Sequence, residues 1–195
     1  VLHWPHPVEK KKGSPMKTRD LIYCALFAAL TAIGAFLQIP TGTVPITLQF
    51  LFTALAGLLL GWKWGAISQL LYVGIGLLGL PVFTQGGGIG YVLQPSFGFL
   101  LGLIPAAAVI GALTARRTGY LTVLAAVLVG DLILYAVGVP YMYLILHVYM
   151  QSAKTFPALL AAMLVYVPGD TLKIVVVTAL APVLRRTLAK AVPNL

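Results

Sequence analysis

Long apolar segments, separated by short polar or basic turns, run through most of the chain. They cover about residues 20–38, 47–61, 65–80, 96–114, 120–139 and 168–184. A helix that crosses the hydrocarbon core of a bilayer needs about 20 largely apolar residues. The pattern therefore predicts an all-α integral membrane protein with six transmembrane helices, in a single membrane domain over residues 16–195.

Two segments differ from this pattern. Residues 141–167 are apolar but are interrupted by Lys154 and Pro157, so we predict an extension of the fifth helix followed by a helix or lid on the outer face. Residues 1–15 are polar and rich in proline and lysine, and we interpret them as a tag or a disordered basic tail.

The basic residues predict the orientation of the helices. Basic side chains gather in cytoplasmic loops. With the N-terminus inside, all the basic turns fall on the cytoplasmic side and Lys154 alone falls outside, whereas a seventh span through 141–167 would place Arg185 and Arg186 outside. We therefore predict six spans, both termini in the cytoplasm and a ligand pocket that opens outward among the long, nearly uncharged outer loops.

Composition excludes several classes of protein. Charged residues make up 9% of the 195 residues, against about 25% in soluble domains, so a water-soluble protein is excluded. The net charge of +9 comes from residues at helix ends rather than from one basic patch, which argues against nucleic-acid binding. Gly86 to Gly90 lack the Lys-Ser/Thr of a phosphate loop, and no nucleophile or metal motif is present. We therefore do not expect an enzyme, a metal site or a cofactor.

An acid–base pair, Asp170 and Lys173, lies inside the last apolar segment. Pro168 and Gly169 precede it and indicate a helix start, and residues three apart share one face of a helix. Charged groups within a membrane usually mark function. The pair can form the polar floor of a pocket for a small ligand that carries N–H donors and a carbonyl or carboxylate. The alternative is a structural ion pair that caps the helix.

Other residues could complete such a pocket. Gln49, Gln85 and Gln94 could supply hydrogen bonds, or could be satisfied amides at helix ends. Aromatic walls could come from Tyr72, Phe83 and Tyr91, although aromatic residues in such segments more often simply pack. Asp131, within the fifth helix, could relay protons or could be a structural acid satisfied by a hydroxyl group or by Lys173.

Small residues recur at helical spacing in the first segment. Ala25 and Ala29 are four residues apart, as are Ala28 and Ala32. Such patterns allow helices to approach closely in lipid. They indicate either internal packing or a face that docks on another membrane subunit.

Three motifs resemble one known family. They are Val44-Pro-Ile-Thr-Leu-Gln49, Gly76-Leu-Leu-Gly-Leu-Pro-Val-Phe83 and Pro168-Gly-Asp-Thr-Leu-Lys173. Together they resemble the BioY family, the substrate-binding (S) components of energy-coupling-factor biotin transporters. The resemblance implies six helices and a high-affinity, outward-facing biotin site beneath the first and third outer loops, in a multi-pass protein of a prokaryotic cell membrane. In that family the Pro-Gly-Asp-x-x-Lys pair contacts biotin, which corresponds to Asp170 and Lys173 here.

The resemblance also implies partners. These are a transmembrane coupling protein and two cytoplasmic ATPases that drive delivery of the captured biotin, with Ala25, Ala29 and Ala32 on the docking face. The predicted ligand-binding residues are Asp170, Lys173, Gln49, Thr47, Tyr72, Phe83, Gln85, Gly86 and Tyr91. The alternative function is a self-sufficient secondary transporter of a small carboxylated solute, for which Asp131 would be the best ion-coupling group.

Replacement of either charged residue tests the predicted site. Lys173→Ala and Asp170→Ala should each weaken biotin binding by at least roughly tenfold while the protein stays folded, because removal of one partner leaves the other charge buried and unpaired. Titration of purified protein with biotin measures this. Near-normal affinity in both variants would contradict the assignment.

Overall fold

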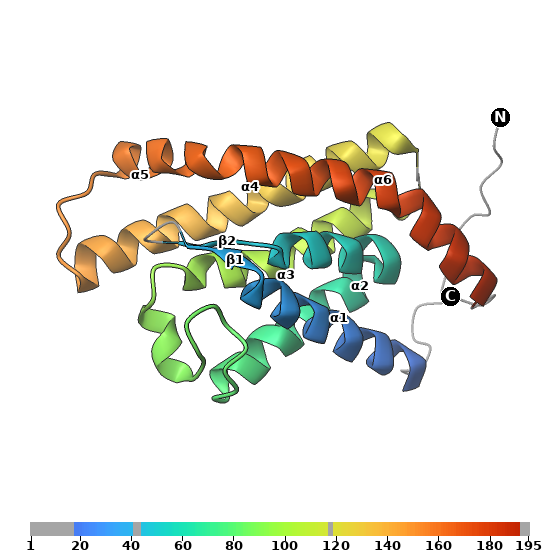
Figure 1. Cartoon of the computed structure of the whole chain (residues 1–195), viewed down its shortest axis with the longest axis horizontal. Helices are drawn as coiled ribbons and strands as arrows, with labels where there is room; N and C mark the ends of the chain where they lie inside the picture. Colours follow the sequence, from blue (N-terminus) through green and yellow to red (C-terminus); the bar gives the residue numbers. More distant parts are fainter. Residues whose placement is uncertain (1–17, 41–43, 117–118, 192–195) are drawn as a thin grey trace.

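The computed structural model describes residues 18–40, 44–116 and 119–191, with side chains described as far as residue 187. The predicted tail at residues 1–15 lies outside the described residues. The described chain is mainly helical (Figure 1). In chain order its elements are α1 (Thr18–Phe36), β1 (Gln38–Ile39), β2 (Ile46–Thr47), α2 (Gln49–Leu77), η1 (Ile89–Leu93), α3 (Phe97–Leu113), α4 (Tyr120–Leu144), η2 (Ile145–Tyr149), α5 (Phe156–Met163), η3 (Leu164–Tyr166) and α6 (Val167–Ala191).

The helix α2 contains two of the predicted segments, folded back on each other. Gly61 has φ 79° and ψ 178°, a backbone conformation that breaks the helix and that glycine adopts without steric cost. On either side, Thr53 donates a hydrogen bond to Gln69 at 2.9 Å, and a Cβ placed on Gly65 would lie 2.8 Å from the Cα of Gly57. Both pairs are centred on Gly61. The two halves of α2 are therefore antiparallel neighbours, and the turn falls next to the predicted basic turn at residues 62–64.

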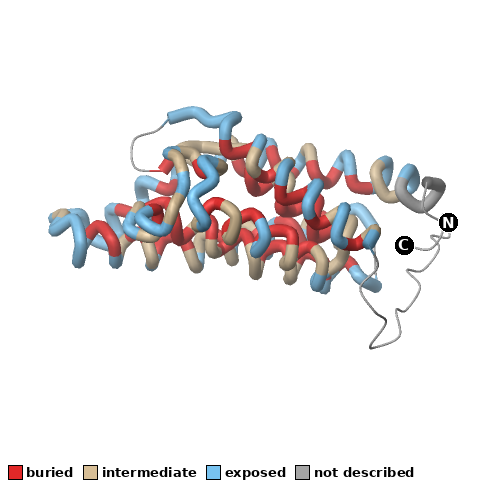
Figure 2. The backbone as a smooth tube through the Cα atoms, turned by 90° about the horizontal axis from the view of Figure 1, so that it is seen from below, coloured by how far each residue is buried: buried red, intermediate tan, exposed pale blue. Residues whose placement is uncertain are grey.

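The outer surface of the bundle is apolar. Figure 2 shows buried positions in the centre of the helix bundle and exposed positions along the outer faces of the helices. Large apolar side chains on those faces are well exposed, among them Ile22 (61%), Leu132 (67%) and Leu172 (65%). Within the described residues, four helical stretches are long and apolar enough to cross a membrane, and α3 is a shorter apolar helix. Exposed apolar faces of this length are typical of a membrane-embedded protein.

The interrupted apolar segment of residues 141–167 is largely helical. The helix α4 continues through Leu144 into the π-helical turn η2, and α5 and η3 then lead directly into α6. The predicted helical extension and the additional short helix are therefore present. In Figure 1 the end of α4 and α5 extend past the loops at the same end of the bundle.

Two connections at this end approach each other. The first is the β1–β2 hairpin between α1 and α2, in which Gln38 pairs with Thr47 and Ile39 with Ile46. The second is the loop of residues 78–96, which η1 interrupts. The amide of Gln38 donates a hydrogen bond to the carbonyl of Thr84 at 3.3 Å, so that the two connections are joined directly.

The close contact within α2 can be tested by substitution. Gly65→Ala should lower the unfolding temperature, because its Cβ would be forced against the backbone of Gly57, and overpacking of this kind typically costs about 1–3 kcal/mol. Gly74→Ala is the matched control on the same half of α2, since nothing lies within 4 Å of its added Cβ. Thermal unfolding in detergent compares the two variants. Equal unfolding temperatures would contradict the antiparallel packing of the halves.

Candidate ligand-binding site

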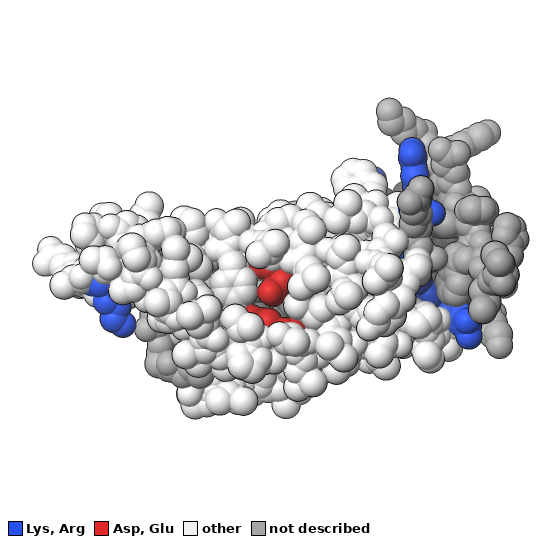
Figure 3. Space-filling model, turned by 90° about the horizontal axis from the view of Figure 1, so that it is seen from above, with Lys and Arg blue, Asp and Glu red and all other residues white. Residues whose placement is uncertain are grey.

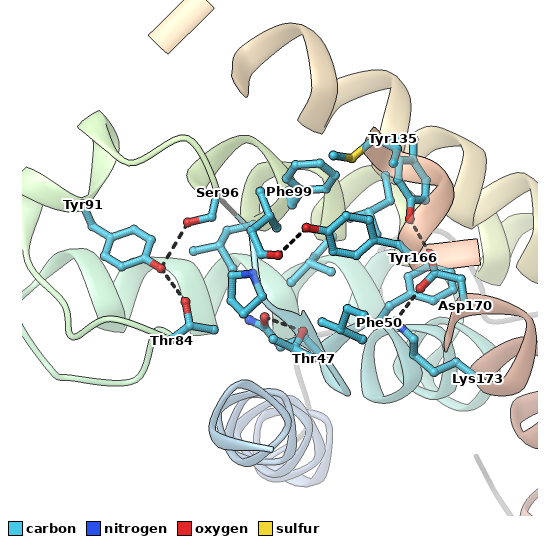
Figure 4. Close-up of a pocket in the computed structure, with 18 residues that line it drawn as sticks. Thr47, Phe50, Thr84, Tyr91, Ser96, Phe99, Tyr135, Tyr166, Asp170 and Lys173 are labelled. Atoms are coloured by element: carbon cyan, nitrogen blue, oxygen red, sulfur yellow. Dashed lines mark hydrogen bonds and ion pairs between the residues drawn. The ribbon is translucent and has the colours of Figure 1, made fainter. Parts of the chain in front are cut away.

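A pocket lies where the β1–β2 hairpin and the loop of residues 78–96 meet α4 and α6 (Figure 4). Its volume is about 620 Å³, counted with its open mouth. Its walls come from five parts of the chain: residues 44–50, the loop 84–96, α3, α4 and residues 163–173. Residues far apart in the sequence therefore meet around one cavity.

One end of the pocket is charged. Asp170 and Lys173 on the first turns of α6 both line it, although each is only 7% exposed. The Nζ atom of Lys173 lies 2.5 Å from Oδ1 of Asp170, and the hydroxyl of Tyr135 on α4 donates to Oδ2. The pair thus combines the two interpretations that the sequence left open, since it is an ion pair and also faces a cavity. A carboxylate and an ammonium group there offer an acceptor and a donor to a ligand.

The opposite end carries neutral hydroxyl groups. The hydroxyl of Tyr91 lies 2.8 Å from Oγ1 of Thr84 and 3.3 Å from Oγ of Ser96. Figure 4 shows these three residues far from Asp170 and Lys173, with Phe99 and other side chains between them. The middle of the pocket is mainly apolar, with side chains of Phe50, Phe99, Leu100, Leu103, Leu134 and Met163. The arrangement suits an elongated ligand with an apolar body and a polar group at each end.

Five of the nine predicted ligand-binding residues line the pocket: Thr47, Gln49, Tyr91, Asp170 and Lys173. Gln49 holds a wall in place, because its side chain accepts from Thr47 at 2.9 Å and donates to the hydroxyl of Tyr72 at 2.8 Å.

The other four predicted residues lie outside the lining. Tyr72 and Phe83 are both 1% exposed and sit behind the wall, where their rings pack edge to face with centroids 5.6 Å apart. Gln85 is exposed and Gly86 half-buried in the turn that follows Phe83. Tyr72 and Phe83 therefore support the wall from behind. Gln85 and Gly86 lie in the loop of residues 78–96 but do not line the pocket.

Two tyrosines in the lining were not predicted from the sequence. Tyr135 donates to Asp170, and Tyr166 donates to the backbone carbonyl of Val44, which joins η3 to the segment before β2. Each bond joins residues far apart in the chain. The spacing of Asp131 and Tyr135, one helical turn, was the available signal, but nothing in the sequence shows that this face of α4 meets α6.

The alanines of α1 lie on two faces of that helix. Ala25 and Ala29 are exposed, Ala32 is half-buried and Ala28 is buried. Internal packing therefore uses Ala28, and the first pair remains available on the surface.

These features define a membrane-embedded bundle of apolar helices with a pocket for a small polar ligand at one end. The model of the BioY family matches residues 9–190, and the chain belongs to this family. It is 54% identical over 141 residues to a probable biotin transporter BioY of Lysinibacillus sphaericus, covering 71% of this chain and 72% of that protein. It is 36% identical over 164 residues to the biotin transporter BioY of Thermotoga maritima, covering 84% and 94%.

A solved structure agrees with these relationships. The crystal structure of the S component for biotin from an ECF-type ABC transporter superimposes with a TM-score of 0.75 at 30% identity, covering 88% of this chain and 95% of that one. The bundle is therefore an S-component fold, and the chain is a transport protein rather than an enzyme.

The contact between α4 and α6 can be tested through Tyr135. Tyr135→Phe should lower the unfolding temperature, because it leaves one oxygen of the buried Asp170 without its donor, a change that costs about 1–3 kcal/mol. Tyr143→Phe is the control, since within the described chain its ring stacks on His147 and its hydroxyl makes no hydrogen bond. Equal unfolding temperatures for the two variants would show that the Tyr135 bond is unimportant.

Proposed function

We propose that this protein is the high-affinity biotin-binding membrane subunit of an ECF-type vitamin uptake transporter. The observation that carries the proposal is the pocket with a buried carboxylate and ammonium at one end, in a chain whose relatives are named biotin transporters. The similarity to a solved S component for biotin supports the same conclusion.

The chemistry of biotin complements this pocket. Biotin has two ureido N–H donors, a ureido carbonyl, an apolar bicyclic body and a carboxylate at the end of an alkyl chain. Asp170 accepts from the ureido N–H groups, and Lys173 binds either the ureido oxygen or the carboxylate. Thr47, Gln49 and Tyr91 add neutral hydrogen bonds along the wall. Tyr72 and Phe83 support this wall from behind. For Gln85 and Gly86, the support is that they belong to the loop of residues 78–96, part of which lines the pocket.

In this proposal the long apolar helices of the described chain form six transmembrane segments. They are α1, the two halves of α2 on either side of Gly61, α3, α4 and α6. Figure 3 shows basic side chains gathered toward one end of the molecule and a smaller basic patch near the other. In this proposal the crowded end faces the cytoplasm, as the distribution of basic residues favours. Both termini then lie on the cytoplasmic side of a prokaryotic cell membrane, and the pocket opens to the outside.

Delivery of the ligand requires partners in this proposal. A transmembrane coupling protein docks on the exposed face of α1 that carries Ala25 and Ala29, with Ala32 at its edge, and two cytoplasmic ATPases supply the energy. The second candidate is a self-sufficient secondary transporter of a small carboxylated solute. Asp131, an acid within α4, is the observation that favours it.

Binding of biotin by the purified chain tests the proposal. We expect native mass spectrometry to detect bound biotin and calorimetric titration to give tight one-to-one binding. Desthiobiotin, which keeps the ureido group, should bind, whereas an analogue methylated on both ureido nitrogens should bind much more weakly. Failure to bind biotin would contradict the proposal, and biotin uptake by the chain alone in proteoliposomes under a pH gradient would favour the second candidate.

A further inference from the structure

The pocket described above leaves Asp131, an acidic residue of α4, unused. Asp131 lies on α4 and is not among the residues that line the pocket. Its Oδ1 atom is buried and has no hydrogen-bond partner within the described chain. A buried carboxylate oxygen without a partner is unfavourable and is rare in folded proteins. Its position therefore calls for an explanation in terms of its neighbours.

The register of α4 against α6 brings Asp131 to the same level of the bundle as Lys173. The two helices run in opposite directions along one side of the bundle (Figure 1), and Tyr135 bonds to Asp170 across them. One turn from Tyr135 toward the start of α4 leads to Asp131, and one turn from Asp170 along α6 leads to Lys173. Both steps point the same way along the bundle, and Asp131 lies within electrostatic range of Asp170 and Lys173.

Figure 3 shows acidic atoms together in one hollow near the middle of a face that is otherwise formed by uncharged residues. The acids of α4 and α6 in the described chain are Asp131 and Asp170. Neither α3 nor the first half of α2 contributes a charged residue near them. Among the described residues of α4 and α6, Lys173 is therefore the cation that pairs with Asp170 and also lies within electrostatic range of Asp131.

We propose that Asp131 is a positioning residue of the pocket, the carboxylate to which the ammonium of Lys173 moves when ligand N–H groups occupy Asp170. The proposal rests on the proposed function. It gives Lys173 two alternative partners, Asp170 before the ligand engages and Asp131 afterwards.

Competition for Asp170 favours this exchange. Both of its oxygens already accept, Oδ1 from Lys173 and Oδ2 from Tyr135. Each oxygen keeps a second lone pair, but two ligand N–H donors and the ammonium then compete for one negative charge. A shift of Lys173 away from Asp170 toward the ligand would leave its buried ammonium without a carboxylate from the protein unless a second acid lies within reach, which is unfavourable. With Asp131 one turn deeper, the ammonium stays paired and can still point a further proton at the ligand.

A double-mutant cycle on ligand affinity tests this. Asp131→Asn should weaken biotin binding by about tenfold in the otherwise native chain but by less than about twofold in the Lys173→Met background, because Asp131 acts through Lys173. Asp131→Glu keeps the carboxylate and should restore most of the affinity. Asp20→Asn, which alters a buried acid of α1 outside the pocket lining, is the control. Unchanged affinity in Asp131→Asn, or the same loss in both backgrounds, would overturn the proposal.

A second measurement needs no ligand, so it separates this inference from the proposed function. If Lys173 can pair with either acid, the double variant Asp131→Asn/Asp170→Asn should lower the unfolding temperature by clearly more than the sum of the two single changes. Losses that simply add would overturn the inference, even if biotin binds. Absence of biotin binding by the native chain would contradict the proposed function alone, and the unfolding temperatures would still decide the role of Asp131.

Discussion

The structure depends on keeping two opposite charges inside an apolar bundle. Asp170 and Lys173 are buried and face each other at 2.5 Å, and lipid can supply neither with a partner. Each charge must be satisfied by protein groups or by a ligand. Several elements meet around this pair for that reason: α4 supplies Tyr135, and η3 holds the segment before β2 through Tyr166. The position of the last helix is therefore coupled to the composition of the pocket.

Close helix packing provides the frame that holds this end together. Apolar burial gives little preference for one helix contact over another in lipid, so backbone approach through small residues matters more. Gly57 and Gly65 let the two halves of α2 touch, and Gly61 reverses the chain between them. The helix termini that result bring the β1–β2 hairpin and the loop 78–96 to the end where α6 begins. A scaffold of this kind can hold irregular backbone at the edge of a membrane because that backbone lines a cavity.

The helices could be predicted from the sequence because a chain in lipid must satisfy its backbone internally, so each long apolar segment is helical. Asp170 and Lys173 were identified by a related argument, because charged residues are costly within a membrane and usually mark function. Tyr135 and Tyr166 could not be found this way, since their partners lie 35 and 122 residues away in the chain. Tyr72 and Phe83 were predicted to bind the ligand and lie behind the lining instead, because periodicity cannot tell a side chain in the wall from one directly behind it. Gln85 is exposed, so the sequence also could not show which polar loop residues line the pocket.

The pocket lies between segments that are far apart in the sequence and are joined to one another by few hydrogen bonds. Residues 44–50, the loop 84–96 and the first turns of α6 form its walls, and a handful of hydrogen bonds joins them, including Gln38 to Thr84 and Tyr166 to Val44. A ligand that reaches from the charged pair to the hydroxyl groups of Thr84, Tyr91 and Ser96 would touch all three segments at once. Its binding energy would then also stabilise their assembly, because a ligand that binds the folded arrangement shifts the equilibrium toward it. Recognition of the ligand and ordering of this end of the bundle are, on this argument, one event, and a partner protein that senses the order of these segments would sense the ligand.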